Sequence, residues 1–290
     1  MIYLLIVSLI WAFSFGLIKD NLTGLDSNFV AFARLFLSLI VFMPFLRLKN
    51  ITAKLRVKLI LTGAVQYGIM YLTYIYSYQF LKAYEVAIFV IFMPLYVTLI
   101  NDILERRFSR LFLITSILSI AGAAVIVYKE FQRTDFIIGL LLMQVSNLCF
   151  AFGQVYYKKI FSNEKHVNDS QMFALLYLGA VLITGVFASF SISFSELAIT
   201  STQLYSLIYL GAISSGLCFF LWNLGARKTD AGTLAVMNNF KVPLAVAASV
   251  FIFGEEGDLI RMSIGLVIIL TALFFNGPLM KRLLPQFIKQ

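Results

Sequence analysis

Lys241 stands near the centre of an apolar segment, residues 231–253, that is long enough to cross a bilayer as a helix. It lies about ten residues into that segment, or about 15 Å along a helix axis, which is roughly half the hydrocarbon thickness of a membrane. Lipid cannot hydrate an amine at this depth, so such a residue normally faces a partner, a cavity or a ligand. No acidic residue of the sequence lies at a matching depth, and we therefore predict that an anionic group on a small molecule binds Lys241. The structural alternative is a lysine bonded to helix carbonyls that Pro243 leaves free.

Two amides, Asn238 and Asn239, precede this lysine by about one helical turn. Amide groups in an apolar environment must find hydrogen-bond partners. We predict that this pair binds the polar part of a substrate, with cross-linking of helices as the alternative. Other apolar segments carry further polar and aromatic candidates for the same site, for which a structural role is an equal alternative: Trp11, Ser14, Asn147, Trp222 and Asn223.

A row of tyrosines marks the apolar segment 59–81. Tyr67, Tyr71, Tyr74 and Tyr78 are spaced so that all four share one face of a helix. A tyrosine combines an apolar ring with a polar hydroxyl, which suits a cavity wall, and its ring attracts ammonium groups. We predict that Tyr67, Tyr71 and Tyr74 contribute to the site, whereas Tyr78 is near enough to a membrane surface to belong to an aromatic belt.

Two further charged positions are assigned structural roles. Arg34 is about five residues into the apolar segment 29–46, close enough to its end for the side chain to extend to the membrane surface. Glu105, followed by two arginines, lies at the end of another apolar segment. We expect it to act as an anchor or gate latch rather than as a binding residue.

The elements that position these residues are apolar segments that fill nearly the whole chain. The 290 residues are 61% hydrophobic and 13% charged, with a mean hydropathy of +0.91, whereas a soluble domain has roughly 25% charged residues. We predict an all-α integral membrane protein, with its first segment a retained helix rather than a signal peptide. Ten transmembrane helices are expected over residues 2–18, 29–46, 59–81, 84–104, 110–128, 136–157, 170–190, 202–224, 231–253 and 259–279.

The distribution of basic residues predicts the orientation of these helices. If the N-terminus is cytoplasmic, most of the 23 lysines and arginines fall in the inner loops. This asymmetry places both termini in the cytoplasm. It also explains the net charge of +9 without a nucleic-acid partner.

The chain also contains an internal repeat. Pro94 and Pro243 lie near the centres of the fourth and ninth predicted helices, and each is followed eleven or twelve residues later by a glutamate. We predict two repeats, residues 1–130 and 131–290, each with five helices. Because five is odd, the second repeat enters the membrane in the opposite direction, and sites in such inverted repeats lie near the midplane between the halves. The two prolines are predicted hinges.

Three local patterns resemble the drug/metabolite transporter superfamily, specifically its EamA-type ten-helix carriers. Residues 11–19 are similar to the Trp-Gly-Ser-x-Phe…Lys opening of that family, with Ala12 in place of the usual glycine. Residues 33–36 are similar to its Arg-Phe element, and a proline followed by Gly/Leu-Glu-Arg occurs at 94–106 and, without the arginine, at 243–256. The resemblance covers essentially the whole chain. It implies that the helices at 110–128 and 259–279 are peripheral and that the other eight surround a central cavity. The family carries amino acids, other metabolites and drugs.

Several kinds of chemistry have no signal in the sequence. There is no Walker A motif, no HExxH or GxSxG pattern and no pair of carboxylates at one depth. The single histidine, His166, lies in a charged loop, and Cys149 and Cys218 lack metal-type spacing. We therefore expect no catalytic residues, no metal and no cofactor.

These observations predict a secondary transporter of the bacterial inner membrane that moves an anionic or zwitterionic small molecule by alternating access. An amino acid or another carboxylate-bearing compound is the first expectation for its substrate. A larger amphiphilic vitamin- or cofactor-like metabolite is the alternative, and a pore or a membrane structural partner is the non-carrier alternative. The lipid bilayer is its surroundings, and the sequence leaves a homodimer open.

Overall fold

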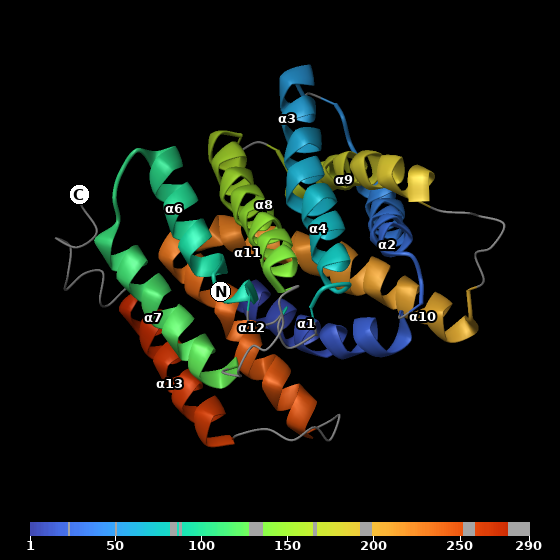
Figure 1. Ribbon diagram of the computed structural model, residues 1–290. Helices are drawn as coiled ribbons and strands as arrows, with labels where there is room; N and C mark the ends of the chain where they lie inside the picture. Colours follow the sequence, from blue (N-terminus) through green and yellow to red (C-terminus); the bar gives the residue numbers. More distant parts are fainter. Residues whose placement is uncertain are drawn as a thin grey trace.

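The fold is helical throughout the part of the chain that the computed structural model describes. That part comprises residues 1–22, 24–49, 51–81, 86, 89–127, 136–164, 167–191, 199–251 and 259–277. The elements, labelled in Figure 1, are α1 (Ile2–Asn21), α2 (Ser27–Phe42), η1 (Met43–Phe45), α3 (Ala53–Gly63), η2 (Ala64–Ile69), α4 (Met70–Ser77), α6 (Met93–Glu105), α7 (Arg110–Val127), α8 (Phe136–Asn163), α9 (Asp169–Ser191), α10 (Ser201–Tyr209), η4 (Leu210–Leu217), α11 (Cys218–Lys228), α12 (Ala231–Phe251) and α13 (Leu259–Phe275).

Several helix starts are fixed by capping side chains. The Asp26 carboxylate accepts a hydrogen bond from the Phe29 amide, so α2 begins two residues before the predicted start. Thr52 caps α3 in the same way, so this rod begins six residues earlier than predicted. Thr200 and Gln203 form a reciprocal capping box at the start of α10.

Five of the helical rods are long and apolar enough to cross a membrane. They are Ser27–Phe45, Ala53–Ser77, Ile137–Ser162, Asp169–Ser191 and Ser201–Lys228, and shorter apolar helices lie at Ile2–Ser14, Arg110–Val125 and Leu259–Phe275. Large apolar side chains such as Phe190 are exposed on the outside of the bundle, which fits a lipid surrounding. The membrane class predicted from the sequence agrees with these features, whereas the count of ten spanning helices stays a prediction.

Two rods contain a π-helical segment at their centre, η2 between α3 and α4, and η4 between α10 and α11. A π turn alters the regular backbone pairing and is often found at functional positions. In η4 the carbonyl of Ser214 accepts a hydrogen bond of 2.9 Å from the Trp11 indole, and that of Gly211 accepts one of 2.8 Å from the Ser38 hydroxyl. The hydroxyl of Tyr177 donates to the carbonyls of Ser215 and Gly216. Side chains from three other helices are thereby held against η4.

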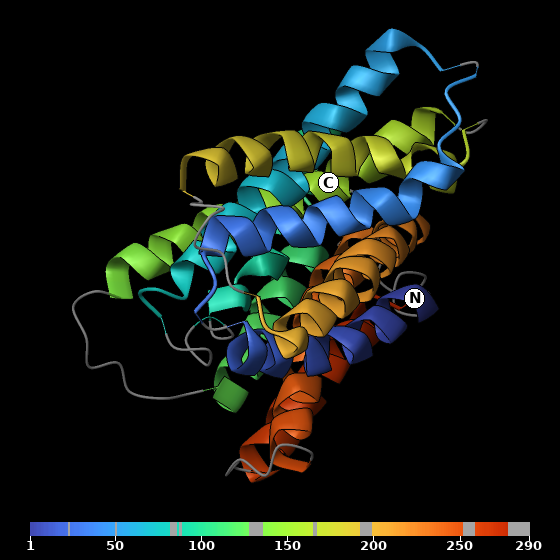
Figure 2. The same ribbon diagram turned by 90° about the vertical axis from the view of Figure 1, so that its right-hand side faces the viewer.

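The rods that carry these segments pack closely on two long helices. α2 packs against η4, α9 packs against η2 and α3, and α2 and α9 lie side by side along the bundle (Figure 2). Glycines permit the closest approach, because a Cβ atom at Gly63 would lie 1.9 Å from the Leu176 carbonyl oxygen, and one at Gly179 would lie 1.9 Å from that of Ile60. α7 and α13 pack on each other at one edge of the bundle (Figure 1).

The predicted helix 84–104 is interrupted before Pro94. Residues 89 and 90 are helical, residues 91 and 92 form a turn, and α6 begins at Met93. Proline lacks an amide hydrogen and so cannot bond the carbonyl one turn earlier. The matching proline, Pro243, lies inside α12 without ending it. The predicted start of the helix at 84–104, residues 84 and 85, lies outside the described residues.

Candidate functional site

A cavity of about 90 Å³ lies among helices from both ends of the sequence. Residues of α1, α2, α4, α6, α8, η4, α11 and α12 line it, together with Val90. The lining residues are Trp11, Ser14, Ile18, Arg34, Met70, Tyr71, Tyr74, Val90, Met93, Met143, Ser146, Asn147, Phe150, Ser214, Phe219 and Lys241. Neither α7 nor α13 contributes a described residue to it.

Lys241 lines this cavity from α12, as the position of the charge in the sequence predicts. The residue is only 7% exposed, and its Nζ lies 5.2 Å from the centre of the Trp11 ring, within the range of a cation–π contact. Among the residues that the structure describes, Nζ makes no hydrogen bond or ion pair. The alternative, a lysine held by helix carbonyls near Pro243, is therefore not what this part of the structure contains.

Arg34, to which the sequence assigned a structural role near the membrane surface, lies in the cavity instead. It is 3% exposed and faces the cavity rather than extending to the membrane surface. Its Nε and Nη2 donate to the Ser215 hydroxyl at 3.2 and 3.0 Å, and its Cζ lies 4.9 Å from the centre of the Tyr71 ring. Nη1 is buried and has no hydrogen-bond partner among the residues that the structure describes. The earlier start of α2 and its close packing against η4 place the guanidinium deeper than its sequence position indicates.

η4 links the two cations of the cavity. Its Ser214 carbonyl fixes Trp11, whose ring faces Lys241, and the next residue, Ser215, fixes Arg34. The Ser215 hydroxyl also shares a hydrogen bond of 2.7 Å with that of Tyr71. No Asp or Glu occurs among the lining residues in the described ranges. The cavity therefore presents two positive groups and offers them only neutral partners, which is the arrangement expected of a site for an anion.

The rest of the cavity wall is apolar and aromatic. The Trp11 ring lies 5.4 Å from that of Phe219 and 6.1 Å from that of Phe150, both in edge-to-face geometry. Met70, Met93 and other aliphatic side chains complete this wall. Such a surface suits the apolar body of a ligand, while a few polar groups fix its orientation. Tyr71, Tyr74 and Ser14 lie on the lining, as predicted.

The asparagine pair before Lys241 lies outside the lining. Asn238 donates to the Gln154 side chain at 3.2 Å and to the Leu234 carbonyl at 2.9 Å. Asn239 donates to the Ile91 carbonyl at 2.9 Å. Both residues therefore join α12 to neighbouring backbone and side chains, which is the alternative stated above, and their role in binding a substrate stays a prediction.

Asn147 does line the cavity, but its amide is already engaged. It donates to the Phe89 carbonyl at 2.7 Å, two residues before the carbonyl that Asn239 binds. Two asparagines from α8 and α12 therefore satisfy backbone groups beside the interruption before Pro94. The sequence shows both asparagines and the proline, but it does not show that these residues, which are distant in the chain, lie close together.

Tyr67, Trp222 and Asn223 are buried beside the cavity without lining it. The Tyr67 ring stacks on Phe219 at 4.6 Å between centroids, and the Trp222 indole donates to Gln154 at 2.8 Å. The side chains of Asn223 and Gln66 exchange hydrogen bonds of 3.2 and 2.8 Å. These residues form a closed aromatic and amide layer against one side of the cavity.

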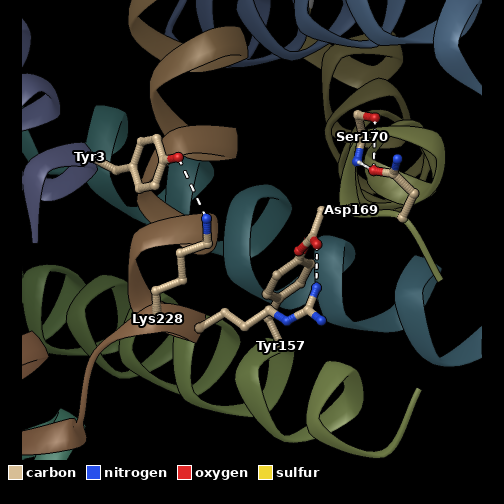
Figure 3. A network of polar contacts seen from close by, with 7 residues as sticks. Tyr3, Tyr157, Asp169, Ser170 and Lys228 are labelled. Atoms are coloured by element: carbon tan, nitrogen blue, oxygen red, sulfur yellow. Dashed lines mark hydrogen bonds and ion pairs between the residues drawn. The ribbon is translucent and has the colours of Figure 1, made fainter. Parts of the chain in front are cut away.

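A polar network beyond this layer joins helix ends (Figure 3). Asp169, at the start of α9, forms an ion pair with Arg227 of α11 and accepts a hydrogen bond of 2.7 Å from the Tyr157 hydroxyl of α8. Nearby, Lys228 Nζ donates to the Tyr3 hydroxyl at 3.5 Å. The ion pair joins residues 58 positions apart and has no local signal in the sequence. The anchor or gate latch expected at Glu105 stays a prediction.

Metal chemistry has no evident place among the described side chains, where no group of three or more His, Cys, Asp or Glu residues could hold an ion. The cavity instead has the lining of a small-molecule site, with two cationic side chains and a largely apolar wall. Among the described lining residues, no pair of groups has the character of a nucleophile and its base.

The sequence matches the EamA-like transporter family over residues 1–128 and 137–277. It is 37% identical over 279 residues to a protein of Salmonella typhimurium named biotin transporter, covering 95% of this chain and 92% of the relative. It is also 37% identical over 280 residues to the biotin transporter of Escherichia coli strain K12, with the same coverage. The probable biotin transporter of Pseudomonas aeruginosa is 35% identical over 276 residues, which cover 94% of this chain and 96% of that protein.

A solved crystal structure of another protein has the same fold. It superposes with a TM-score of 0.78 over 97% of this chain and 98% of its own, at 13% sequence identity. At that identity the similarity concerns the fold alone.

Proposed function

Because this chain belongs to the EamA-like transporter family, we propose that it is a secondary carrier that moves biotin, or a closely similar vitamin-like carboxylate, across the bacterial inner membrane. A transporter rather than an enzyme is what the family and the relatives indicate. The substrate assignment rests on the relatives that are named biotin transporter and are 35% to 37% identical over nearly the whole chain. The vitamin-like alternative is thereby favoured over the amino acid that was the first expectation from the sequence.

The chemistry of the cavity supports this substrate. Biotin has a carboxylate at the end of an aliphatic chain and a compact ring system with a polar urea group. Arg34 and Lys241 offer two positive groups for the carboxylate, and Nη1 of Arg34 is a buried donor with no partner in the described part of the chain. The wall formed by Trp11, Phe150 and Phe219 suits the apolar part of such a molecule. Tyr71, Tyr74, Ser14 and Ser146 also line the cavity. Their hydroxyls already bond to Ser215, Tyr78 and the carbonyls of Ile10 and Met70, and we propose that their remaining acceptor capacity orients the ligand.

Alternating access between two inverted halves, with both termini cytoplasmic, is the proposed mechanism. Support comes from equivalent packing in the two halves. The second helix of each half packs on the π segment of the other half, in the pairs α2–η4 and α9–η2. The first helix of each half packs on the fourth helix of the other half, in the pairs α1–α12 and α8–α6. The two π segments occupy the third helix of each proposed half, residues 1–130 and 131–290. The break before Pro94 and the proline within α12 are the proposed flexible points around the site.

Uptake into vesicles tests the proposal. Purified protein is reconstituted and the entry of labelled biotin is measured against concentration, with unlabelled biotin and amino acids as competitors. Saturable entry that biotin inhibits and amino acids do not is expected. Entry that rises linearly with concentration would indicate a pore, and inhibition by amino acids but not by biotin would restore the first expectation from the sequence. The variant Lys58→Met, at an exposed lysine of α3, serves as the unaffected control.

A further inference from the structure

Arg34 and Lys241 form a pair of buried positive groups whose charges the described part of the cavity does not balance. Arg34 keeps its charge in proteins, and its partners are a serine hydroxyl and a tyrosine ring. Among the described residues, the amine of Lys241 makes no hydrogen bond or ion pair and lies over the ring of Trp11. Neutral dipoles and aromatic faces reduce the cost of burying a cation, but they do not cancel its charge.

A carrier changes access in two directions, and its cavity can hold substrate in one direction and be empty in the other. To change access, a carrier must pass through a closed state in which the site is cut off from bulk water. A cavity that closes around two unbalanced cations loses their hydration and keeps their mutual repulsion, both of which raise the free energy of the closed state. A bound carboxylate supplies a negative charge and acceptor atoms at the same place, so the loaded cavity closes at a lower cost.

We propose, on the premise of the proposed function, that this carrier works by exchange: it returns across the membrane with an organic carboxylate bound rather than empty. The empty form changes access slowly because Arg34 and Lys241 would be enclosed without a counter-ion. A second carboxylate-bearing molecule on the opposite side of the membrane therefore accelerates entry of the first. The counter-substrate is any small organic carboxylate that fits the cavity, including biotin itself.

Initial rates of labelled biotin entry into reconstituted vesicles measure this property. One set of vesicles contains unlabelled biotin and the other only buffer of the same pH and ionic strength. We expect preloading to raise the entry rate by roughly tenfold, which corresponds to a difference of about 1.4 kcal/mol in the barrier. Equal rates in the two sets overturn the exchange proposal. If the equal rates are saturable, the proposed function stands without exchange; if no saturable entry is found in either set, both proposals fail.

Substitution of Lys241 tests whether the ratio of the two entry rates depends on the charge of this residue. In Lys241→Met one unbalanced cation is removed, so the empty form returns faster and the ratio of the two rates falls toward one, even if biotin binds more weakly. Lys241→Arg retains the ratio because it retains the charge, and Lys58→Met retains it because that residue is outside the cavity. An undiminished ratio in a folded Lys241→Met protein contradicts the proposed cause.

Movement of a proton is another way to reset the empty carrier, and one further measurement distinguishes it from exchange. Vesicles without internal biotin are given a pH difference across the membrane at constant outside pH. Under exchange, the entry rate stays at its low value. A pH difference that accelerates entry as much as internal biotin does would show that proton movement resets the carrier, and would overturn the proposal.

Discussion

In the proposed site, two cations are held in different ways. Arg34 is fixed by two hydrogen bonds to Ser215 and by the ring of Tyr71, whereas the amine of Lys241 lies over the face of Trp11 and makes no hydrogen bond or ion pair among the described residues. In the proposed function, the fixed guanidinium sets the position of a carboxylate, and the flexible four-carbon stem of the lysine lets its amine follow it. Two such groups would allow a site lined largely by apolar groups to select for charge.

Ser215 is the residue through which Arg34 is positioned, so Ser215→Ala should weaken charge recognition without removing a charge. The substitution removes the acceptor of two arginine hydrogen bonds, and we expect the Kd for biotin to rise roughly three- to tenfold. The ratio of the affinities for biotin and its neutral amide should fall as well. Titration of both ligands measures this. Ser263→Ala, an exposed hydroxyl of α13 that bonds within its own helix, is the control; an unchanged ratio in Ser215→Ala would contradict the positioning role.

What the sequence can predict at the residue scale depends on how local the signal is. Lys241 was found because a charge inside an apolar run is conspicuous without any knowledge of neighbours. Arg34 was misplaced because its depth depends on where α2 begins and on how it packs against η4. Asn238 and Asn239 were assigned to a substrate because their partners, Gln154 and the Ile91 carbonyl, are distant in sequence.

At the scale of elements, irregular helix turns supply the backbone groups around the cavity. η4 receives Trp11, Tyr177 and Ser38, and the interruption before Pro94 receives Asn147 and Asn239. The apolar runs predict most of the helices, because length and hydropathy are properties of the local sequence. The π segments could not be predicted in this way, since a π turn has no distinct pattern of hydrophobicity and depends on partners from other helices.

The close crossing of α3 and α9 requires glycine at specific positions. Gly179→Ala would place a Cβ 1.9 Å from the Ile60 carbonyl oxygen, so the two helices must separate, and we expect a loss of roughly 1–3 kcal/mol in stability. Thermal unfolding in detergent measures it. Gly185→Ala is a matched control on α9, because its Cβ would meet only the Phe32 side chain at 3.3 Å. Equal unfolding temperatures for the two variants would contradict the tight crossing.

At the scale of the whole molecule, the cavity is closed on one side by layers of increasing polarity. The aromatic and amide groups around Trp222 and Asn223 lie next to the cavity, and the ion pair of Asp169 and Arg227 ties α9 to α11 beyond them. The lining residues of the cavity come from both proposed halves of the chain.

The ion pair should matter for stability but not for affinity. Asp169→Asn leaves Arg227 partly buried without its counter-ion and weakens the contact with Tyr157, so we expect a loss of about 1–3 kcal/mol in the free energy of unfolding. The Kd for biotin should remain within about twofold, because neither residue lines the cavity. Exchanging the charges, with Asp169→Arg and Arg227→Asp together, should recover part of the stability. A large change in affinity with normal stability would place this pair in the binding site instead.

The central claim is that positive groups inside the cavity bind the carboxylate of the substrate, and calorimetric titration of the purified protein with biotin and biotinamide tests it most directly. We predict that the wild-type protein binds biotin at least about tenfold more tightly than the neutral amide. We also predict that Lys241→Ala reduces this preference severalfold and that Lys241→Arg preserves it. Equal binding of biotin and biotinamide by the wild-type protein, or an unchanged preference in a folded Lys241→Ala variant, would contradict it.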